Sequence, residues 1–337
     1  MTTIALDAMG TDTYPDTDIR GAILATREYD NLDLILVGDE KLLREKLAEY
    51  APKDDFPIRI VHAPEMLTMN DKGDDLVRKA RHKEAQNSMA VGVDLVKNGE
   101  ADAFVTAGNT GAAMVTALFR LGRLRGINRP ALAPTFPTAK GNCLVLDIGA
   151  NPDCKPRNLV EFAVMGSVYA EKVWGAKKPK VGLISNGEEA GKGSSLVRET
   201  YPLLEEANIN FTGNVEGKGV IAGEVDVAVT DGFTGNVMLK TSEGIAKLMT
   251  DSIKEAVMQG GVFAKIGGLL LKPALRQVKE KLDANAVGGV PLLGVNGLVF
   301  IGHGSSNSEA VKNAIRAAKE AVEAGVLVSI IEAVEKR

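Results

Sequence analysis

Short apolar runs alternate with stretches of helical pattern along this chain, and this alternation limits the possible folds more than any other feature of the sequence. The runs are rich in β-branched and aliphatic residues, as buried strands are. They span Ile4 to Asp7, Leu34 to Val37, Ile58 to Val61, Ala103 to Val105, Leu144 to Ile148, Val181 to Ile184 and Val225 to Val229. Strands that alternate with helices build parallel sheets through crossover connections. The sequence therefore predicts an α/β protein.

Most of these runs end in glycine, asparagine or aspartate. The loops that follow them are Asp7 to Gly10, Val37 to Asp39, Ala107 to Gly111, Asp147 to Asn151, Ser185 to Gly187 and Thr230 to Gly232. Ordinary turn chemistry explains any one of these loops. In open α/β sheets, however, the carboxyl ends of the strands form the ligand crevice. Taken together, the loops favour one shared site.

The chain shows no repeat and no Pro/Ser-rich linker, so we predict a single unit over residues 1–337. The pattern from Asn236 to Asp283 is mostly helical and is longer than a standard crossover. We therefore expect a helical hairpin within residues 236–285 that projects from the sheet.

The composition indicates a folded, acidic protein. The 337 residues are 45% hydrophobic, enough for a full core, and the net charge of −4 gives no general nucleic-acid footprint. Two cysteines, Cys143 and Cys154, build no disulfide framework, which fits a reducing cytoplasm. The first residues do not form a secretory signal. The longest apolar stretch, Val262 to Leu271, contains Lys265 and is too short to span a bilayer. We expect a cytoplasmic protein that is soluble or lies on a membrane surface.

The loop from Ser185 to Ser195 has the composition of an anion-binding turn. It follows an apolar run and leads into a helix start, so backbone N–H groups and the positive end of the helix dipole point at one small volume. Lys192 adds a charge there, and Asn186, Gly193 and Ser194 add donors. The glycine spacing differs from that of the nucleotide-binding P-loop, so we expect an anion such as phosphate without a nucleotide. A surface loop whose glycines only make turns explains the same residues.

Two further turns precede helical patterns and offer donors of the oxyanion-hole kind. One is formed by Asn109, Thr110 and Gly111, and the other by His303, Gly304 and Ser305. His303 is suited to donate to an anion or to a thioester carbonyl. The alternatives are plain helix caps and a histidine that backbone hydrogen bonds fix in a turn.

Carboxylates at or just beyond the predicted strand ends raise the question of a metal site. They belong to Asp7, Asp12, Asp147 and Asp231. Aspartates in such positions also order loops, and these four show no fixed ligand spacing, so we expect no metal. The cysteines have no histidine near them in the sequence, and we interpret them as structural.

Two segments concentrate basic charge on this acidic chain. The first, from Arg120 to Arg129, contains four arginines and no acid. Arg120, Arg123 and Arg125 suit the docking of an anionic partner, since arginine pairs well with carboxylates and phosphates. A solvated helix end, where the dipole favours cations, is the alternative.

The second segment, from Val262 to Lys281, carries five basic residues against one acid among large aliphatic side chains. This composition is typical of a segment that lies in a membrane interface, and it equally suits a helical dimer contact. The expected membrane contacts are Val262, Phe263, Leu269, Leu270 and Leu271.

With these motifs in view, the chain resembles the phosphate acyltransferase family of bacterial phospholipid synthesis, the PlsX type. The matching blocks follow one another in order nearly from end to end. They are Asp7 to Gly10, Thr106 to Gly111, Arg129 to Ala133, Leu146 to Pro156, Phe162 to Ser167, Ser185 to Glu189, Gly191 to Gly193, Asp231 to Val237, Pro291 to Val295 and His303 to Ser306. One departure is Thr11, where the family usually carries a second glycine before Asp12.

The resemblance implies a three-layer α/β/α sandwich like that of isocitrate and isopropylmalate dehydrogenases and of phosphotransacetylases, assembled as a homodimer. It implies an enzyme that converts acyl-[acyl-carrier protein] and inorganic phosphate to acyl phosphate and free carrier protein. The acyl phosphate supplies the acylation of glycerol 3-phosphate, so the downstream acyltransferase is a further expected partner. The resemblance also implies peripheral association with an anionic membrane surface and no cofactor beyond the two substrates.

This chemistry fits the residues. Phosphate is already a nucleophile at neutral pH, and a thiolate leaves readily because thiols titrate near about 8.5. The enzyme has to position the dianion beside the thioester and to stabilise the oxyanion. We expect Lys192 to be the catalytic residue, with the turns at Asn109 and His303 as further donors. The alternatives are a coenzyme A-dependent phosphate acyltransferase, a dehydrogenase, for which the G-x-G-x-x-G motif is missing, and a non-catalytic membrane scaffold for the carrier protein.

Overall fold

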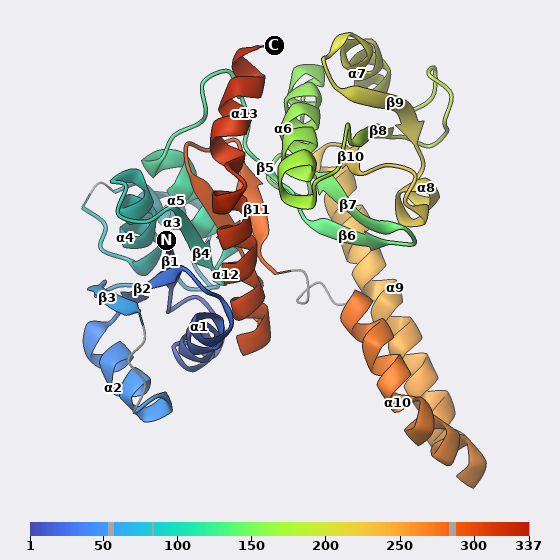
Figure 1. Ribbon diagram of the computed structural model, residues 1–337. Coiled ribbons are helices and arrows are strands. Elements are labelled where there is room, and N and C mark those ends of the chain that lie inside the picture. Colours follow the sequence, from blue (N-terminus) through green and yellow to red (C-terminus); the bar gives the residue numbers. More distant parts are fainter. Residues whose placement is uncertain (53–56, 83, 283–287, 337) are drawn as a thin grey trace.

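Two β-sheets lie side by side in the computed structural model, which describes residues 1–52, 57–82, 84–282 and 288–336 (Figure 1). The first sheet has seven strands in the order β3-β2-β1-β4-β12-β11-β5. These are β1 (Thr2–Asp7), β2 (Leu32–Gly38), β3 (Ile58–His62), β4 (Ala103–Thr106), β5 (Ala131–Leu132), β11 (Val290–Leu293) and β12 (Leu298–Ile301). The strands from β3 to β12 are parallel, and β11 is antiparallel to both of its neighbours.

The second sheet is inserted between β5 and β11 and has five strands in the order β6-β7-β10-β8-β9. They are β6 (Thr135–Thr138), β7 (Gly141–Leu146), β8 (Lys180–Ile184), β9 (Asn210–Val215) and β10 (Val227–Val229). All neighbours in this sheet are parallel except β6 and β7. Loops that follow β7, β10 and β8 therefore leave the sheet at one edge.

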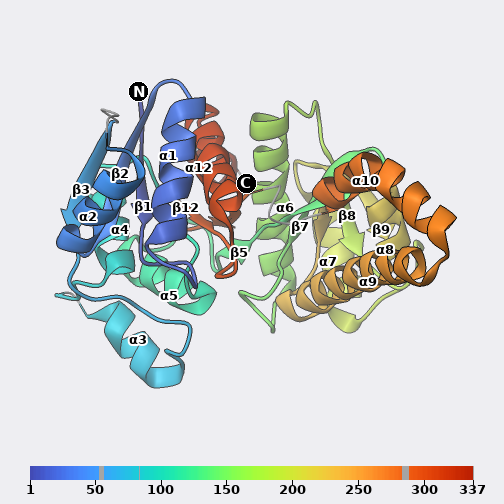
Figure 2. The same cartoon turned by 90° about the horizontal axis from the view of Figure 1, so that it is seen from below.

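Helices cover both faces of each sheet and give the molecule three layers (Figure 2). In the first half, α1 (Asp16–Glu28), α2 (Glu40–Tyr50) and α12 (Ser308–Glu323) lie on one face, and α4 (Ser88–Lys97) and α5 (Thr110–Arg120) lie on the other, with α3 (Gly73–Arg81) packed on α5. In the second half, α6 (Pro156–Trp174) and α7 (Ser195–Glu206) face α8 (Gly217–Ala222) and the start of α9 (Gly232–Gln259) across the sheet. Helix α13 (Val326–Glu335) packs on α6.

The side chains of β1 show how alternation builds these layers. Ile4 and Leu6 join a core that contains residues of α1 and α12, whereas Ala5 joins the core under α4 and α5. The core that contains Ile4 continues into the second half through Leu144 and Phe162. The two sheets therefore share a continuous buried interior.

A helical hairpin of α9 and α10 (Val262–Leu282) projects away from the second half (Figure 1). This agrees with the mostly helical pattern between Asn236 and Asp283, although the last residues of the expected segment, 283–285, lie outside the described residues. No helix in the described part of the chain is long and apolar enough to cross a membrane.

All seven strands predicted from apolar runs are present, with shifted ends. The run Leu144 to Ile148 begins earlier in the structure and ends at Leu146, because the Asp147 carboxylate binds the backbone of the following turn. The α/β/α class is confirmed.

Candidate active site

A cavity of about 500 Å³ lies between the two halves of the molecule. Its walls come from the start of α5, the turn after β12, the turn after β7 and the first turns of α9. Apolar side chains form most of the lining, among them Met114, Leu132, Ile148 and Leu239. Its polar groups belong to Thr110, Asn236, Lys240, Glu243, His303 and Ser306. A mostly apolar lining with a few polar groups suits a ligand that combines an apolar part with a polar group.

A second cavity, of about 580 Å³, adjoins the first and shares Thr110, Gly111 and His303 with it. It lies between the start of α3 and the start of α5, and Lys72 and Gly73 form part of its wall. Two of the turns predicted from the sequence, at Asn109 and at His303, therefore meet at the border of two adjoining cavities.

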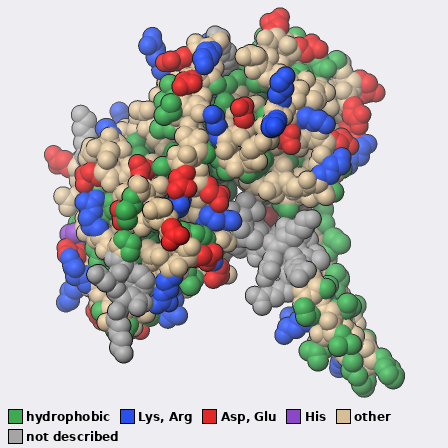
Figure 3. All heavy atoms as spheres, viewed as in Figure 1, with side chains coloured by type: hydrophobic (Ala, Val, Ile, Leu, Met, Phe, Trp, Pro, Cys, Tyr) green, Lys and Arg blue, Asp and Glu red, His purple; other side chains and the backbone are tan. Residues whose placement is uncertain are grey.

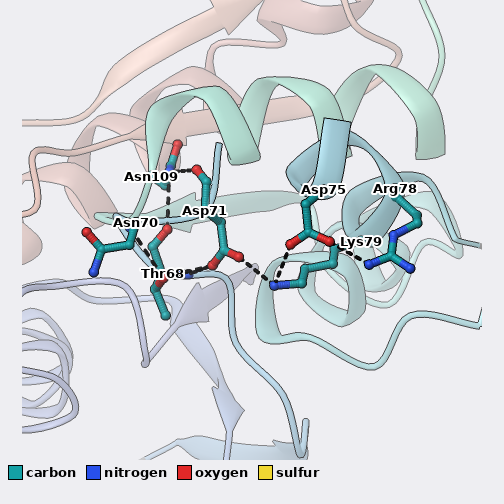
Figure 4. A network of polar contacts seen from close by, with 7 residues as sticks. All are labelled: Thr68, Asn70, Asp71, Asp75, Arg78, Lys79 and Asn109. Carbon is teal, nitrogen blue, oxygen red and sulfur yellow. Dashed lines mark hydrogen bonds and ion pairs between the residues drawn. The ribbon is translucent and has the colours of Figure 1, made fainter. Parts of the chain in front are cut away.

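Asn109 caps α5 and also holds the segment that leads into α3 (Figure 4). Its Oδ1 accepts from the N–H of Ala112 at 3.1 Å, and its Nδ2 donates to the carbonyls of Thr68 and Asp71 at 3.1 and 3.0 Å. Both amide hydrogens are thus in use. The exposed N–H groups of Thr110 and Gly111, in the first helical turn, have no acceptor among the described residues and are the donors that this turn offers to a ligand.

An ion-pair network continues along α3 from the hydrogen bonds that Asn109 makes with Thr68 and Asp71 (Figure 4). The Asp71 carboxylate accepts from Thr68 N–H at 2.7 Å and pairs with Lys79 at 2.6 Å. Lys79 and Arg78 both pair with Asp75. The hydrogen bond from Lys79 holds the pKa of Asp71 at about 2, so the pair stays ionised at neutral pH. This network was not predicted from the sequence, because its members are spaced as on an ordinary charged helix surface.

The ring of His303 is oriented by the serine two residues later. Ser305 donates its N–H to Nδ1 at 3.3 Å, and its Oγ lies 2.8 Å from the same nitrogen. Nδ1 therefore acts as an acceptor, and a neutral ring carries its proton on Nε2. His303 is exposed and lines both cavities, so Nε2–H is a donor available to a ligand.

The loops after β1, β4 and β12 touch one another behind these turns. The N–H of Asp12 donates to the carbonyl of Gly304 at 2.8 Å. A Cβ on Gly10 would lie 2.9 Å from the backbone nitrogen of Gly108, so glycine is needed for this approach. Thr106 donates to the buried carboxylate of Asp7 at 2.7 Å and accepts from Gly108 N–H. The position of the α5 turn is thus set by the ends of neighbouring strands.

Thr11, which departs from the family pattern, has a partner that a glycine could not serve. Its hydroxyl donates to Asp18 Oδ2 at 2.7 Å, and both side chains are buried. Asp18 Oδ1 has no partner among the described residues. Burial, and to a smaller extent the neighbouring Asp7, raises the pKa of Asp18 to about 8. Asp18 is therefore mostly protonated at neutral pH.

Asp147 fixes the wall that the second half contributes to the first cavity. Its buried carboxylate accepts from the N–H groups of Leu132, Ile148, Ala150 and Asn151, at 2.6 to 3.3 Å, and from the Asn151 amide at 3.0 Å. Leu132 belongs to the first sheet, so this one carboxylate also ties the two halves together. The sequence marked Asp147 as a strand-end carboxylate, and the structure shows that it orders the loop.

The N-terminal turn of α9 packs directly on the Asp147 loop, and Gly235 permits the contact. A Cβ at position 235 would lie 1.9 Å from the carbonyl oxygen of Asp147, which is backbone and has no easy way to move. We expect Gly235→Ala to displace α9, to lower the free energy of unfolding by about 2 kcal/mol or more and to impair the cavity. Urea unfolding measures the change.

Gly244→Ala is the matched control, because a Cβ at Gly244 of the same helix meets nothing within 4 Å. Alanine has the higher helix propensity, so this variant should equal or exceed the parent in stability. Equal stability of the two variants would show that the contact at Gly235 is not tight.

Lys192 lies in the loop between β8 and α7, at the same sheet edge as the turns after β7 and β10. It is exposed, and neither it nor Asn186, Gly193 or Ser194 lines the two cavities above. The structure therefore brings the Asn109 and His303 turns together and places the Lys192 loop on the other half of the molecule.

The Lys192 loop nevertheless has features of an anion-binding loop. Gly193 has φ +99°, which requires glycine, and a Cβ there would lie 3.1 Å from Ser185 Oγ. That Ser185 hydroxyl is buried without a partner among the described residues. Ser194 caps α7 by accepting from Val197 N–H at 3.4 Å. A buried unpaired hydroxyl beside a lysine and a helix start is a donor set that an anion would satisfy.

The three arginines predicted to dock a partner differ in their exposure. The Arg120 side chain is only 8% exposed, pairs with Asp94 and donates to the carbonyl of His82 at 2.9 Å. Its guanidinium is engaged in these internal contacts, so Arg120 does not belong to a docking surface. Arg123 and Arg125 are exposed.

The remaining titratable groups do not add a nucleophile or a metal site within the described ranges. Burial raises the pKa values of Cys143 and Cys154 to about 12, so both thiols are protonated at neutral pH. No group of three or more His, Cys, Asp or Glu side chains in the described part of the chain is arranged to hold a metal ion.

Comparisons with known proteins agree with this architecture. The sequence profile described as "Fatty acid synthesis protein" matches residues 2–329. The phosphate acyltransferase of Elusimicrobium minutum is 49% identical over 327 residues, which cover 97% of this chain and 94% of that protein.

Two solved structures share the fold. The EutD phosphotransacetylase from Staphylococcus aureus superposes with a TM-score of 0.61 at 20% identity and covers 95% of this chain and 94% of its own. The 4-hydroxythreonine-4-phosphate dehydrogenase from Klebsiella pneumoniae superposes with a TM-score of 0.54 at 14% identity and covers 96% of this chain and 100% of its own. Both the phosphotransacetylase-like and the dehydrogenase-like character of the fold are thus confirmed.

Proposed function

The chain belongs to the phosphate acyltransferase family of enzymes, and on this premise we propose that it transfers an acyl group from acyl-[acyl-carrier protein] to inorganic phosphate. A phosphate oxygen attacks the thioester carbonyl carbon, and a tetrahedral oxyanion forms. The C–S bond then breaks, and the carrier protein leaves as a thiolate that takes up a proton. The products are acyl phosphate and free carrier protein.

The observation that carries this proposal is the cavity between the halves. Its lining is mostly apolar, which suits an acyl chain, and donors stand at its border with the second cavity, where Thr110, Gly111 and His303 meet. A thioester carbonyl at this border would receive hydrogen bonds from the N–H groups of the α5 turn or from His303 Nε2. A ligand without an apolar chain would leave this lining in water.

Phosphate is placed by charge rather than by a general base. We assign Lys192, the Ser185 hydroxyl and the donors around Gly193 and Ser194 to the phosphate or to the developing oxyanion. This requires the Lys192 loop and the α5 turn to act on one reacting centre from opposite halves of the molecule. We propose that the two halves close around the substrate and so bring the two donor sets together.

The experiment that tests the proposal supplies three thioesters, namely acyl-[acyl-carrier protein], acyl-coenzyme A and acyl-pantetheine, with inorganic phosphate. Acyl phosphate is trapped by hydroxylamine as the acyl hydroxamate. We expect the highest kcat/KM with the carrier protein. A preference for acyl-coenzyme A would instead identify a coenzyme A-dependent phosphate acyltransferase.

We also propose that the α9–α10 hairpin forms the homodimer contact and binds an anionic membrane surface at the cytoplasmic side. Hydrophobic side chains gather on the projecting hairpin (Figure 3). They include Phe263 at 91%, Leu270 at 76% and Leu269 at 70% exposure. Leu271 and Val262 are exposed beside them. Peripheral binding there would bring acyl phosphate close to the glycerol 3-phosphate acyltransferase that uses it.

We expect the double variant Leu269→Glu/Leu270→Glu to lose most of its binding to vesicles with anionic lipid, because two charges replace apolar contacts with the lipid. Sedimentation with vesicles measures the bound fraction, and Leu203→Glu on α7, whose leucine is 40% exposed, is the control. Equal sedimentation of the parent and the double variant would contradict the membrane contact.

A further inference from the structure

Helix α3 stands at the entrance of the site and is not needed to cover the sheet. It packs on α5, which lies between it and the strands (Figure 2). Its first residue, Gly73, and the preceding Lys72 line the second cavity, next to the donor turn of α5. A helix in this position meets whatever approaches the cavity from outside.

The last turns of α3 are cationic, although the first turn carries Asp74 and Asp75 and the chain as a whole has a charge of −4. Leu76 and Ala80 are buried against the protein, whereas Arg78, Lys79 and Arg81 are exposed in the last turns. Lys79 pairs with Asp71, whose carbonyl accepts from Asn109, so Lys79 is already engaged in the network described above. Arg78, with 77% of its side chain exposed, and Arg81 are the cations that a partner can reach.

An exposed aromatic ring adjoins Arg81. The Arg81 guanidinium lies 5.3 Å from the centre of the Phe119 ring, which is 46% exposed at the end of α5. Arginine and aromatic residues are both enriched in protein interfaces, and arginine is among the residue types that contribute most to binding energy there. Charge and apolar surface are thus combined in one place.

The distance from this surface to the reacting turn fits a tethered thioester. Helices α3 and α5 run in the same direction, since both begin at the second cavity and Arg120 near the end of α5 donates to His82 just after the end of α3. The nine residues of α3 span about 13 Å. A phosphopantetheine arm has roughly the reach of five extended residues, about 17 Å, so it covers this distance.

We propose that Arg78, Arg81 and Phe119 form the docking surface for an acidic acyl-carrier protein, whose arm enters the site past Lys72. This rests on the proposed function, because it names the partner of the same site. Arg123 and Arg125 follow α5 and would extend the surface, whereas Arg120 serves inside the protein. The ion pair of Arg78 with Asp75 is exposed and exchanges readily for a carboxylate of the partner.

The test compares Arg78→Glu/Arg81→Glu and Phe119→Ser with the parent enzyme, and Lys41→Glu/Lys177→Glu is the matched control for charge reversal at exposed positions elsewhere. Two thioesters are supplied, acyl-[acyl-carrier protein] and acyl-pantetheine. We expect the KM for the carrier protein to rise about tenfold in the arginine variant, while the kinetics with acyl-pantetheine stay unchanged. Added salt should raise the parent's KM for the carrier protein more than that of the variant.

Failure of the docking surface and failure of the proposed function give different results. An unchanged KM for the carrier protein in Arg78→Glu/Arg81→Glu and in Phe119→Ser would overturn the proposed surface. A rise in Arg123→Glu/Arg125→Glu would then place docking beyond α5. A rise of the same size in the control variant would show a general charge effect and would also overturn it. Absence of acyl phosphate from either thioester with the parent enzyme would instead remove the proposed function.

Discussion

Replacing Lys192 by alanine should lower the rate of acyl phosphate formation by roughly 10²- to 10³-fold, the usual loss when one charged or oxyanion-binding donor is removed from a preorganised site. The fold should persist, because Lys192 is exposed and no ion pair in the described structure involves its side chain. The unfolding midpoint in urea should therefore equal that of the parent.

The pattern of kinetic loss identifies the group that Lys192 contacts. If it binds phosphate in the ground state, the KM for phosphate should rise with a smaller change in kcat, whereas contact with the oxyanion alone should lower kcat. Lys192→Arg, which keeps the charge and changes the geometry, should retain intermediate activity. Lys177→Ala, an exposed lysine in the same half of the molecule, is the control. Near-parental turnover by Lys192→Ala would remove the Lys192 loop from the reaction.

The second large effect concerns stability rather than rate, and it comes from Asp18. The pKa of Asp18 is about 8 in the folded protein, against 3.8 for an unperturbed aspartate. Between these values the folded state holds a proton that the unfolded state has lost. The stability contributed by neutral Asp18 is therefore full below pH 4 and falls by up to about 1.4 kcal/mol per pH unit as the pH rises toward 8.

Asp18→Asn removes this titration while it keeps the acceptor for the Thr11 hydroxyl. We expect the free energy of unfolding of the parent to fall by about 3 kcal/mol relative to the variant between pH 5 and pH 7.5. Urea unfolding at four pH values measures the difference, with the exposed Asp74→Asn as the control. Burial also raises the pKa of Asp7, so part of the slope should remain in Asp18→Asn. Parallel curves for parent and variant would show that Asp18 is ionised in the folded protein.

The alternation of apolar runs and helices predicted the strands and the fold class because it reflects burial along the chain, which the sequence carries locally. The division into two sheets was not predicted. Strand β5 has only two residues and β6 contains Pro137, so neither stands out as a strand, and the insertion that they introduce is visible only in three dimensions.

The site was predictable to the extent that its donors sit in glycine-rich turns at strand ends. The turns at Asn109 and His303 do meet at adjoining cavities. The sequence could not show that the Asn109 side-chain amide donates to the carbonyls of Thr68 and Asp71, nor that Arg120 is buried against Asp94. Both depend on contacts between segments more than 25 residues apart. The ion pairs along α3 were missed for a different reason, since their members are spaced as on an ordinary charged helix surface.

Transfer of an acyl group from a carrier-protein thioester to phosphate is tested most directly by one stoichiometric measurement. Acyl-[acyl-carrier protein] is incubated with the enzyme, with and without inorganic phosphate, and the free carrier thiol and hydroxylamine-trapped acyl phosphate are counted together. We expect one acyl hydroxamate for each thiol released and no thiol release without phosphate. Thiol release that is independent of phosphate, or the absence of any trapped acyl group, would contradict this reaction.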